Sequence, residues 1–257
     1  MTTYSRPGVF IEEIELPQTI ELPDNGNAVG GFIGTLSMGP SNVPVLLSSW
    51  NGFVKVFGGL DDAYPTTWAA YNFFANGGRN LYVKRVVGSG AVSATVNLKD
   101  RSTSPGIDTL SITAKSPGTW GNNLAVDVVA AGTSTRFGLV ITLNPGIVEQ
   151  FTDLSMDPTD RRYVVDVINT ASAYVNAADL SSGSTAPDNM PKLTNGTSAA
   201  LSSGANGSAP TSSAYVTALD TFDAVQNPIV FNAPDAAYLT DTSLAEEIQS
   251  AVASYAE

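Results

Sequence analysis

The stretch of sequence that decides the fold is AVGGFIGTLSMGPSNVPVLLSSWNGFVKVFGG, residues 28 to 59. The apolar run Val29 to Leu36 and the β-branched run Val43 to Leu47 both predict β-strands. Ser48 or Ser49 can then cap a short helix that ends at Gly58-Gly59. One face of this helix carries its large apolar residues, Trp50, Phe53, Val54 and Phe57. Strands apolar enough to be buried, joined to amphipathic helices, indicate an α/β structure.

The same scheme continues after this stretch. A second helix is expected over Thr66 to Asn76, where Trp68, Tyr71 and Phe74 or Ala75 lie at helical spacing. The strand NLYVKRVV, Asn80 to Val87, follows. Near the C-terminus the pattern returns, with a helix over Ala214 to Ala224, a buried strand over Asn227 to Pro234 and a helix from Thr242. One face of the last helix is formed by Leu244, Ile248, Val252 and Tyr255.

A parallel α/β unit would need another strand after that last helix. The chain stops at Glu257 without a glycine or asparagine to end the helix. We therefore expect a C-terminal part to be missing from this sequence, or to be supplied by another polypeptide.

The middle of the chain differs in composition and in hydrophobic pattern. Residues 91 to 148 alternate apolar with polar residues and are rich in Val, Ile, Thr and Ser, which predicts a small antiparallel β unit. A helical stretch is expected around Pro158 to Tyr174. Ser181 to Ser213 is dense in small and polar residues and predicts a long loop. This region reads as a separate module.

At the N-terminus, PGVFIEEIELP holds a strand-like run of eight residues between Pro7 and Pro17. Proline supplies no backbone N–H and disfavours helix before it, so the run is predicted to be an isolated extended segment of roughly 26 Å. On a strand, its residues would divide between two faces: Phe10, Glu12, Ile14 and Leu16 on one, and Val9, Ile11, Glu13 and Glu15 on the other. Neither face is purely apolar, so main-chain pairing with a partner is expected to hold the segment.

Composition excludes several classes of function. The 257 residues are 43% hydrophobic and include no cysteine and no histidine, which removes thiolate nucleophiles, Ser-His-Asp relays and zinc sites built on those ligands. The net charge is −12, with one Arg against five acids in residues 1 to 54 and seven acids but no base after Lys192. Because both ends of the chain are acidic, binding of nucleic acid is not expected. The acidic residues are consistent with solubility or with a partner that is basic where the ends dock. No run predicts a membrane span or a secretory signal.

Three motifs could suggest chemistry. The glycines of GNAVGGFIG lack the Lys-Ser/Thr pair of a Walker loop, so close packing and turns are the better interpretation. Asp153, Asp157 and Asp160 lack the spacing of a calcium loop; helix capping or pairing with Arg161 and Arg162 explains them better. Glu12 and Glu13 would point to opposite faces of a strand and cannot easily act as an acid/base pair. We find no catalytic, cofactor-binding or metal-binding set, and expect no enzyme activity.

Blocks along the whole chain carry a family resemblance. PGVFIEE is similar to a PGVYVEE-type signature, and FIGTLSMGPSNVPVLLSSWNGFVKVFGGL to a strand, a GP turn and a Trp-containing helix ending in FGG. The further blocks are Phe73 to Val86, Ser116 to Val126, Val148 to Asn169, Leu201 to Gly207, Tyr215 to Leu219 and NPIVFNAPDA. Together they resemble the tail sheath proteins of contractile-tailed bacteriophages and related contractile injection systems. Asn206 departs from the pattern, since the family usually has an acid there.

The resemblance implies a discontinuous architecture of mixed α/β class. It predicts an extended N-terminal arm at residues 1–20, a sheath core domain formed by residues 21–90 and 201–257, and an inserted antiparallel β-rich domain with a loop at residues 91–200. Family members generally continue well beyond the equivalent of Tyr255. The arm residues Val9 to Leu16 would add a strand to the sheet of a neighbouring subunit: Val9, Phe10, Ile11, Glu12, Glu13, Ile14, Glu15 and Leu16.

The resemblance also implies a function and partners. Sheath subunits form six-fold rings stacked helically around an inner tail tube, between a baseplate and a tail terminator. Contraction drives the tube through the host envelope. The expected location is the phage tail of the virion, after assembly in the bacterial cytoplasm. A non-phage contractile injection particle is the alternative, and another tail or baseplate protein, or an enzyme, is more remote.

Overall fold

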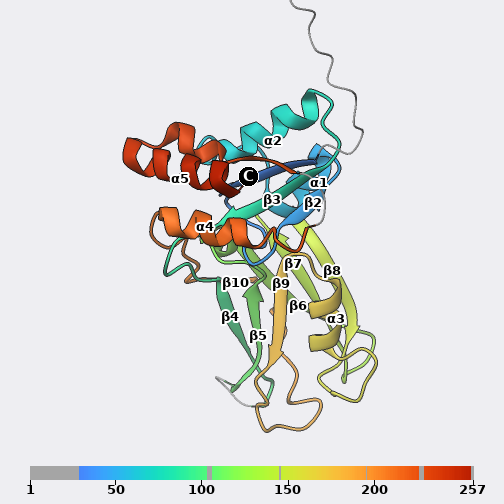
Figure 1. Cartoon of the computed structure of the whole chain (residues 1–257). Helices are drawn as coiled ribbons and strands as arrows, with labels where there is room; N and C mark the ends of the chain where they lie inside the picture. Colours follow the sequence, from blue (N-terminus) through green and yellow to red (C-terminus); the bar gives the residue numbers. More distant parts are fainter. Residues whose placement is uncertain (1–28, 103–105, 145, 195, 226–228, 256–257) are drawn as a thin grey trace, which may run out of the picture.

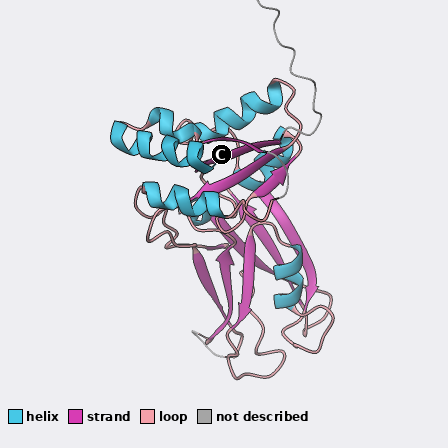
Figure 2. Ribbon diagram, in the orientation of Figure 1, coloured by secondary structure: helices cyan, strands magenta, loops and turns pink. Residues whose placement is uncertain are grey.

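The computed structural model describes residues 29–102, 106–144, 146–194, 196–225 and 229–255. Strands and helices are combined in three sheets and five α-helices within these ranges, which confirms the predicted mixed α/β class. The helix-rich part lies at one end of the molecule and most strands lie at the other (Figures 1 and 2). The arm segment Val9 to Leu16 lies outside the described residues.

The first sheet has the strand order β11-β1-β3-β2. Its strands are β1 (Val29–Thr35), β2 (Val45–Leu47), β3 (Leu81–Val86) and β11 (Ile229–Asn232). β1 pairs in parallel with both β3 and β11, whereas β2 is antiparallel to β3. Two segments that are far apart in the sequence therefore build one sheet.

Helices cover both faces of this sheet (Figure 1). On one face lie α1 (Trp50–Phe57) and α2 (Pro65–Ala75), and on the other lie α4 (Ser212–Asp220), α5 (Thr242–Tyr255) and the short 3₁₀ helix η2 (Pro234–Tyr238). Ser49 caps α1, since its hydroxyl accepts from the backbone N–H of Gly52 at 3.2 Å. The predicted face of α5 is also confirmed: Ile248 is fully buried, and the other three residues pack around the same core.

Two antiparallel sheets form the other end of the molecule, with the orders β4-β5-β9 and β10-β6-β7-β8. They enclose one apolar core, in which Leu110, Leu124 and Phe137 are fully buried. The elements are β4 (Thr95–Lys99), β5 (Asp108–Ala114), the 3₁₀ helix η1 (Thr119–Asn123), β6 (Leu124–Ala130), β7 (Phe137–Leu143), β8 (Gly146–Leu154), α3 (Val164–Ala171), β9 (Val175–Asp179) and β10 (Ala199–Ala200).

The chain passes between the two ends twice, and the two passages lie side by side. Val92 bridges to Ala205, and the backbone N–H of Ser208 donates to the carbonyl of Ser89 at 3.0 Å. At Gly88 a Cβ atom would lie 1.6 Å from the carbonyl oxygen of Ser208. Only glycine allows the two backbones to approach so closely.

Three predicted features need correction. The helix expected around Pro158 to Tyr174 is shorter, because the residues before α3 form turns. Val54, which was predicted on the buried face of α1, is 36% exposed. The buried residues of this helix are Phe53 and Phe57. On α2 the aromatic side chains of Trp68 and Tyr71 face outward, while Thr66, Thr67 and Ala70 are buried. The helix approaches the sheet through these smaller side chains.

Across the described ranges, no helix is both long enough and apolar enough to span a bilayer.

Candidate functional site

Polar and charged side chains gather where β1 and β3 end, at the neck between the two parts of the molecule. Parallel strands place their carboxyl ends at the same edge, so side chains from both strands and from the following loops converge there. Three charged residues of this region are almost completely buried: Lys84, Arg85 and Asp235. Because burial of a charge is costly, each must be explained by its partners.

Asp235, in the first turn of η2, is a buried carboxylate that is held by neutral donors. One oxygen accepts from Thr66 Oγ1 at 2.7 Å, and the other accepts from Tyr215 OH at 3.1 Å. The backbone N–H and hydroxyl of Thr35 donate to that second oxygen. Burial and the Asp235 charge raise the pKa of Tyr215, so its phenol stays a donor. Asp235 thus ties β1, α2 and α4 to η2.

Gly34 belongs to the same cluster. A Cβ atom there would lie 2.1 Å from Thr66 Oγ1 and 2.9 Å from Asp235 Oδ2. At Gly31 it would lie 2.5 Å from a methyl group of Ile229. The prediction that these glycines serve close packing is confirmed at both positions, because α2 and β11 could not approach β1 otherwise.

Arg85 is hydrogen-bonded to the loop that follows β1. Its guanidinium donates to the backbone carbonyls of Leu36, Ser37 and Gly39, at 2.8, 3.1 and 3.0 Å. The backbone N–H of Gly39 in turn donates to Ser116 Oγ in the β-rich part, at 3.1 Å. Burial lowers the pKa of Arg85 to about 10. Arg85 therefore holds the loop after β1 in place, and this loop in turn is hydrogen-bonded to the β-rich part.

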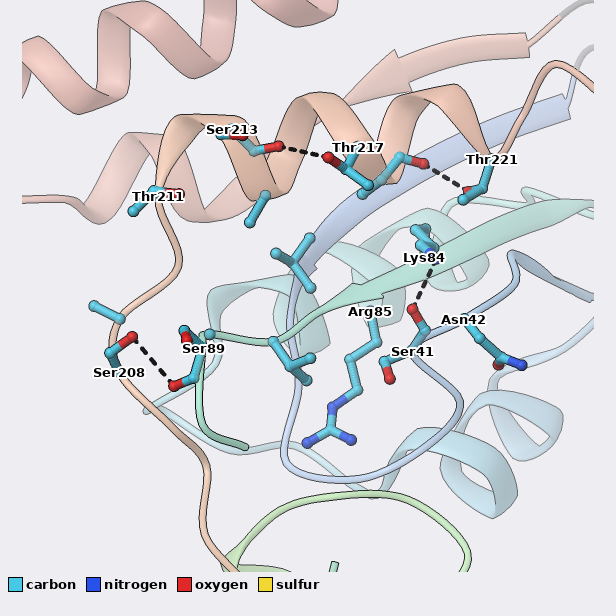
Figure 3. A pocket seen from close by; sticks show the side chains of 16 residues that line it. Ser41, Asn42, Lys84, Arg85, Ser89, Ser208, Thr211, Ser213, Thr217 and Thr221 are labelled. Carbon is cyan, nitrogen blue, oxygen red and sulfur yellow. Dashed lines mark hydrogen bonds between the residues drawn. The ribbon is translucent and has the colours of Figure 1, made fainter. Parts of the chain in front are cut away.

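Lys84 projects from the opposite face of β3 (Figure 3). Its ammonium donates to the carbonyl of Ser41 at 2.8 Å, and no ion pair of the described residues includes it. Burial lowers the pKa of Lys84. The side chain lies at a cavity of about 480 Å³ between β3, the loop at Ser41 and α4. Hydroxyl groups line the α4 side of this cavity, from Thr211, Ser213, Thr217 and Thr221.

β3 lacks a complete set of neighbours at this cavity. β1 pairs with β3 as far as Val86, whereas β2 pairs only with Leu81 to Val83. Over Lys84 to Val86, the side of β3 that faces away from β1 has no partner strand among the described residues. Continuing the antiparallel register of β2 places Pro44 opposite Lys84, and a proline has no backbone N–H to donate to β3.

The acids weighed as calcium ligands do not form one site. Asp157 accepts from the N–H and hydroxyl of Thr159, and Asp160 pairs with Arg136 at 2.6 Å. The predicted helix capping is wrong, because Asp157 and Asp160 stabilise turns before α3. Of the predicted pairing with Arg161 and Arg162, the structure shows a hydrogen bond from the backbone N–H of Arg162 to Asp160, at 2.8 Å. Within the described ranges, no group of three or more acids could hold a metal ion.

Sequence reasoning missed Lys84, Arg85 and Asp235 as a set. Two consecutive cations in the otherwise apolar strand NLYVKRVV were the available indication, because a strand buried on both faces rarely carries charge. Nothing in the sequence pattern indicated that Asp235 would meet Thr35 and Thr66. The predicted arm residues Val9 to Leu16, with Glu12 and Glu13, lie outside the described residues. What the neck region offers is anchoring of the backbone by buried charged side chains.

Comparison with known proteins defines the fold. No family model matches the sequence, and no curated protein matches it. Two solved structures are similar: a sheath tail protein from Listeria innocua, at 17% identity and a TM-score of 0.58, and one from Desulfitobacterium hafniense, at 16% and 0.58. The matches cover 88% and 95% of this chain but only 44% and 48% of those proteins, so the chain spans less than half their length. The chain has the fold of this part of the sheath tail proteins.

Proposed function

We propose that the chain is a structural subunit of a contractile tail sheath. It polymerises around an inner tail tube and contracts to drive the tube through the host cell envelope for genome delivery. The observation that carries this proposal is the likeness to two sheath tail proteins over nearly the whole chain. Independently, the order of the sequence blocks along the chain supports the same family.

The proposed subunit has three parts. Residues 1–20 form an arm, residues 21–90 and 201–257 form a core domain, and residues 91–200 form an inserted domain. The paired passages at Val92 and Ala205 support these boundaries, since the chain leaves and re-enters the first sheet side by side there. The arm strand Val9 to Leu16 joins the sheet of a neighbouring subunit.

Contraction requires no catalytic residue. In the proposed mechanism the extended lattice is metastable, and subunits repack into a lattice of lower free energy. Main-chain hydrogen bonds between an arm and a neighbouring sheet can survive the rotation of the subunits. The absence of histidine and cysteine from the sequence excludes the relays and thiolates of common hydrolases, which fits a structural role.

The partners follow from this role. The subunits form six-fold rings stacked helically, and the assembly contacts the inner tube, a baseplate and a tail terminator, without direct contact with nucleic acid and without membrane insertion. It is built in the host cytoplasm and carried in the virion. A non-phage contractile injection particle would use the same chemistry, and capsid and portal genes beside the gene would favour the phage.

Removal of Met1 to Leu16 tests the role of the arm. Analytical ultracentrifugation should show that the full protein forms large polymers and that the truncated protein stays small, with an unchanged thermal unfolding midpoint. A fall in the midpoint of the isolated monomer would mean that the segment belongs to its own core. Assembly that is insensitive to ionic strength would count against electrostatic docking of the acidic ends.

A further inference from the structure

A row of aromatic side chains leads from the core under α1 to the surface of α2. Phe53 is fully buried, and its ring stacks against that of Trp50 with the ring centroids 5.1 Å apart. Tyr71 meets Trp50 edge-on at 5.3 Å, and Trp68 meets Tyr71 edge-on at 6.5 Å. Trp68 and Tyr71 are 41% and 39% exposed. The row therefore ends in two large aromatic rings that are supported by the core and open to solvent.

Two acidic residues lie beside the exposed end of this row. The indole N–H of Trp68 donates to Asp62 Oδ1 at 3.0 Å, which fixes the orientation of the ring. Asp61 and Asp62 are both exposed, and the ion pairs of the described residues include neither of them. Leu60, which is 43% exposed, adds an apolar side chain. We call these residues the α2 surface: Leu60, Asp61, Asp62, Trp68 and Tyr71.

The chemistry of the α2 surface suits a cation, and arginine above all. A planar guanidinium can stack on an indole ring and donate to a carboxylate at the same time. Exposed Trp and Tyr side chains that are held in place often supply much of the binding energy of an interface. α2 lies at the end of the molecule that is far from the β-rich part, so that part does not cover the α2 surface (Figure 1).

The chain itself carries a matching cation beyond the other end of α2. Arg79 is exposed, and no ion pair in the part of the chain that the structure describes includes it. Residues 72–83 contain no acid, so its charge has no partner close in the sequence. Arg161 is also exposed, but Asp157 and Asp160 lie close to it in the sequence and offset its charge. Arg79 is therefore the better match for the acids of the α2 surface.

The length of α2 separates these two features within one copy. Asp62 precedes the helix and Arg79 follows it, and a helix of 11 residues is roughly 16 Å long. An arginine side chain cannot span that distance, so a contact between the two features requires two molecules.

We propose that the α2 surface binds Arg79 of a second copy of the chain. Each copy then offers its α2 surface to one neighbour and its Arg79 to another. A head-to-tail contact of this kind repeats from copy to copy and builds rings or helical polymers. The proposal rests on the proposed function, which requires contacts between copies, and it names a pair of surfaces that make one such contact.

Site-directed cross-linking tests the proposal, because the sequence contains no cysteine. One pool of the full protein carries Ala63→Cys, at the α2 surface, and an affinity tag. An untagged pool carries Ala75→Cys, near Arg79, and the matched control pool carries Thr159→Cys, near Arg161. All three substituted positions are exposed. After mixing and assembly, a short bis-maleimide joins nearby thiols.

We expect mixed dimers with Ala75→Cys and few with Thr159→Cys. A higher yield with Thr159→Cys would overturn Arg79 as the partner. Equal yields, or no mixed product while polymers still form, would overturn the contact and leave the sheath function standing. Mixed dimers with Ala75→Cys but without polymers would support the contact and contradict the sheath function, and the absence of both would contradict both.

Charge reversal supplies a second readout. Asp62→Arg and Arg79→Asp should each lower the yield of mixed dimers about tenfold, because like charges then face each other. A chain with both substitutions has opposite charges at every contact again and should recover most of the yield. Circular dichroism of the separate pools checks that each variant folds. Unchanged yields for the folded single variants, or no recovery in the double variant, would overturn the pairing.

The aromatic part of the surface has its own test. Trp68→Ala should lower the yield of mixed dimers about fivefold, and Trp68→Phe by less, because the ring is kept. The control is Val216→Ala, an exposed position on α4 where no change is expected. Equal yields for Trp68→Ala and Val216→Ala would overturn the role of the indole.

Discussion

The Asp235 carboxylate joins four elements, because β1, α2 and α4 all donate hydrogen bonds to this residue of η2. All of its donors are neutral, so its negative charge is stabilised by hydrogen bonds alone. Hydrogen bonds to a charged acceptor are stronger than neutral ones, and removal of the acceptor leaves several buried donors without partners. Stability should therefore be sensitive to this one residue.

We expect Asp235→Ala to lower the free energy of unfolding by about 3 kcal/mol in a urea titration. Asp235→Asn keeps one carbonyl oxygen and should cost less. The control is Asp220→Ala, an exposed position on α4 where a change within about 0.5 kcal/mol is expected. Similar losses for Asp235→Ala and Asp220→Ala would show that the cluster does not stabilise the fold.

Asp100, at the end of β4, makes stability depend on pH in the acid range. The backbone N–H of Ile107 and the hydroxyls of Ser102 and Ser184 donate to its carboxylate, at 2.9, 2.7 and 3.0 Å. The main-chain hydrogen bond from Ile107 is the largest cause that holds its pKa below the usual value of 3.8, and the serine hydroxyls add to it. The carboxylate is therefore easier to ionise in the folded than in the unfolded chain.

The sign of the effect follows from linkage. A lowered folded pKa gives stability that is present above about pH 4 and is lost as the pH falls through the folded pKa. We expect the unfolding midpoint of Asp100→Asn to fall less steeply than that of the unchanged protein between about pH 5 and pH 2. Parallel curves for the two proteins would contradict the role of Asp100.

Among the elements, α1 follows most directly from its sequence. The sequence allowed either Ser48 or Ser49 as the cap, and the structure selects Ser49. Loss of an N-cap hydroxyl typically costs about 1 kcal/mol. Ser49→Ala should lower the free energy of unfolding by about that amount, and Ser48→Ala by clearly less. Equal effects of the two substitutions in thermal or urea unfolding would argue against the cap.

Local patterns predicted the strands, the antiparallel region and the buried face of α5, because burial repeats with the period of the element. Local patterns gave wrong predictions where a contact with a residue far away in the sequence determines which side chains are buried or paired. On α2, Thr66 faces the sheet because it donates to Asp235, which is 169 residues away. Before α3, Asp160 forms its ion pair with Arg136, the residue before β7, and the adjacent Arg162 reaches Asp160 only through its backbone N–H. For the candidate site, the cations of β3 were visible in the sequence, but their burial beside α4 was not.

At the scale of the whole molecule, the neck joins two parts with separate cores. Arg85, Gly39 and Ser116 link the loop after β1 to the β-rich part, and the two chain passages lie against each other. In the proposed sheath, such internal links would keep the subunit rigid, so that movement occurs between subunits.

Electron microscopy of the full protein, expressed alone and together with its tube protein, tests the central claim most directly. We predict hollow tubes or stacked rings in both samples, with long narrow and short wide forms around or beside the inner tube. A protein that stays strictly monomeric in both samples would contradict the account.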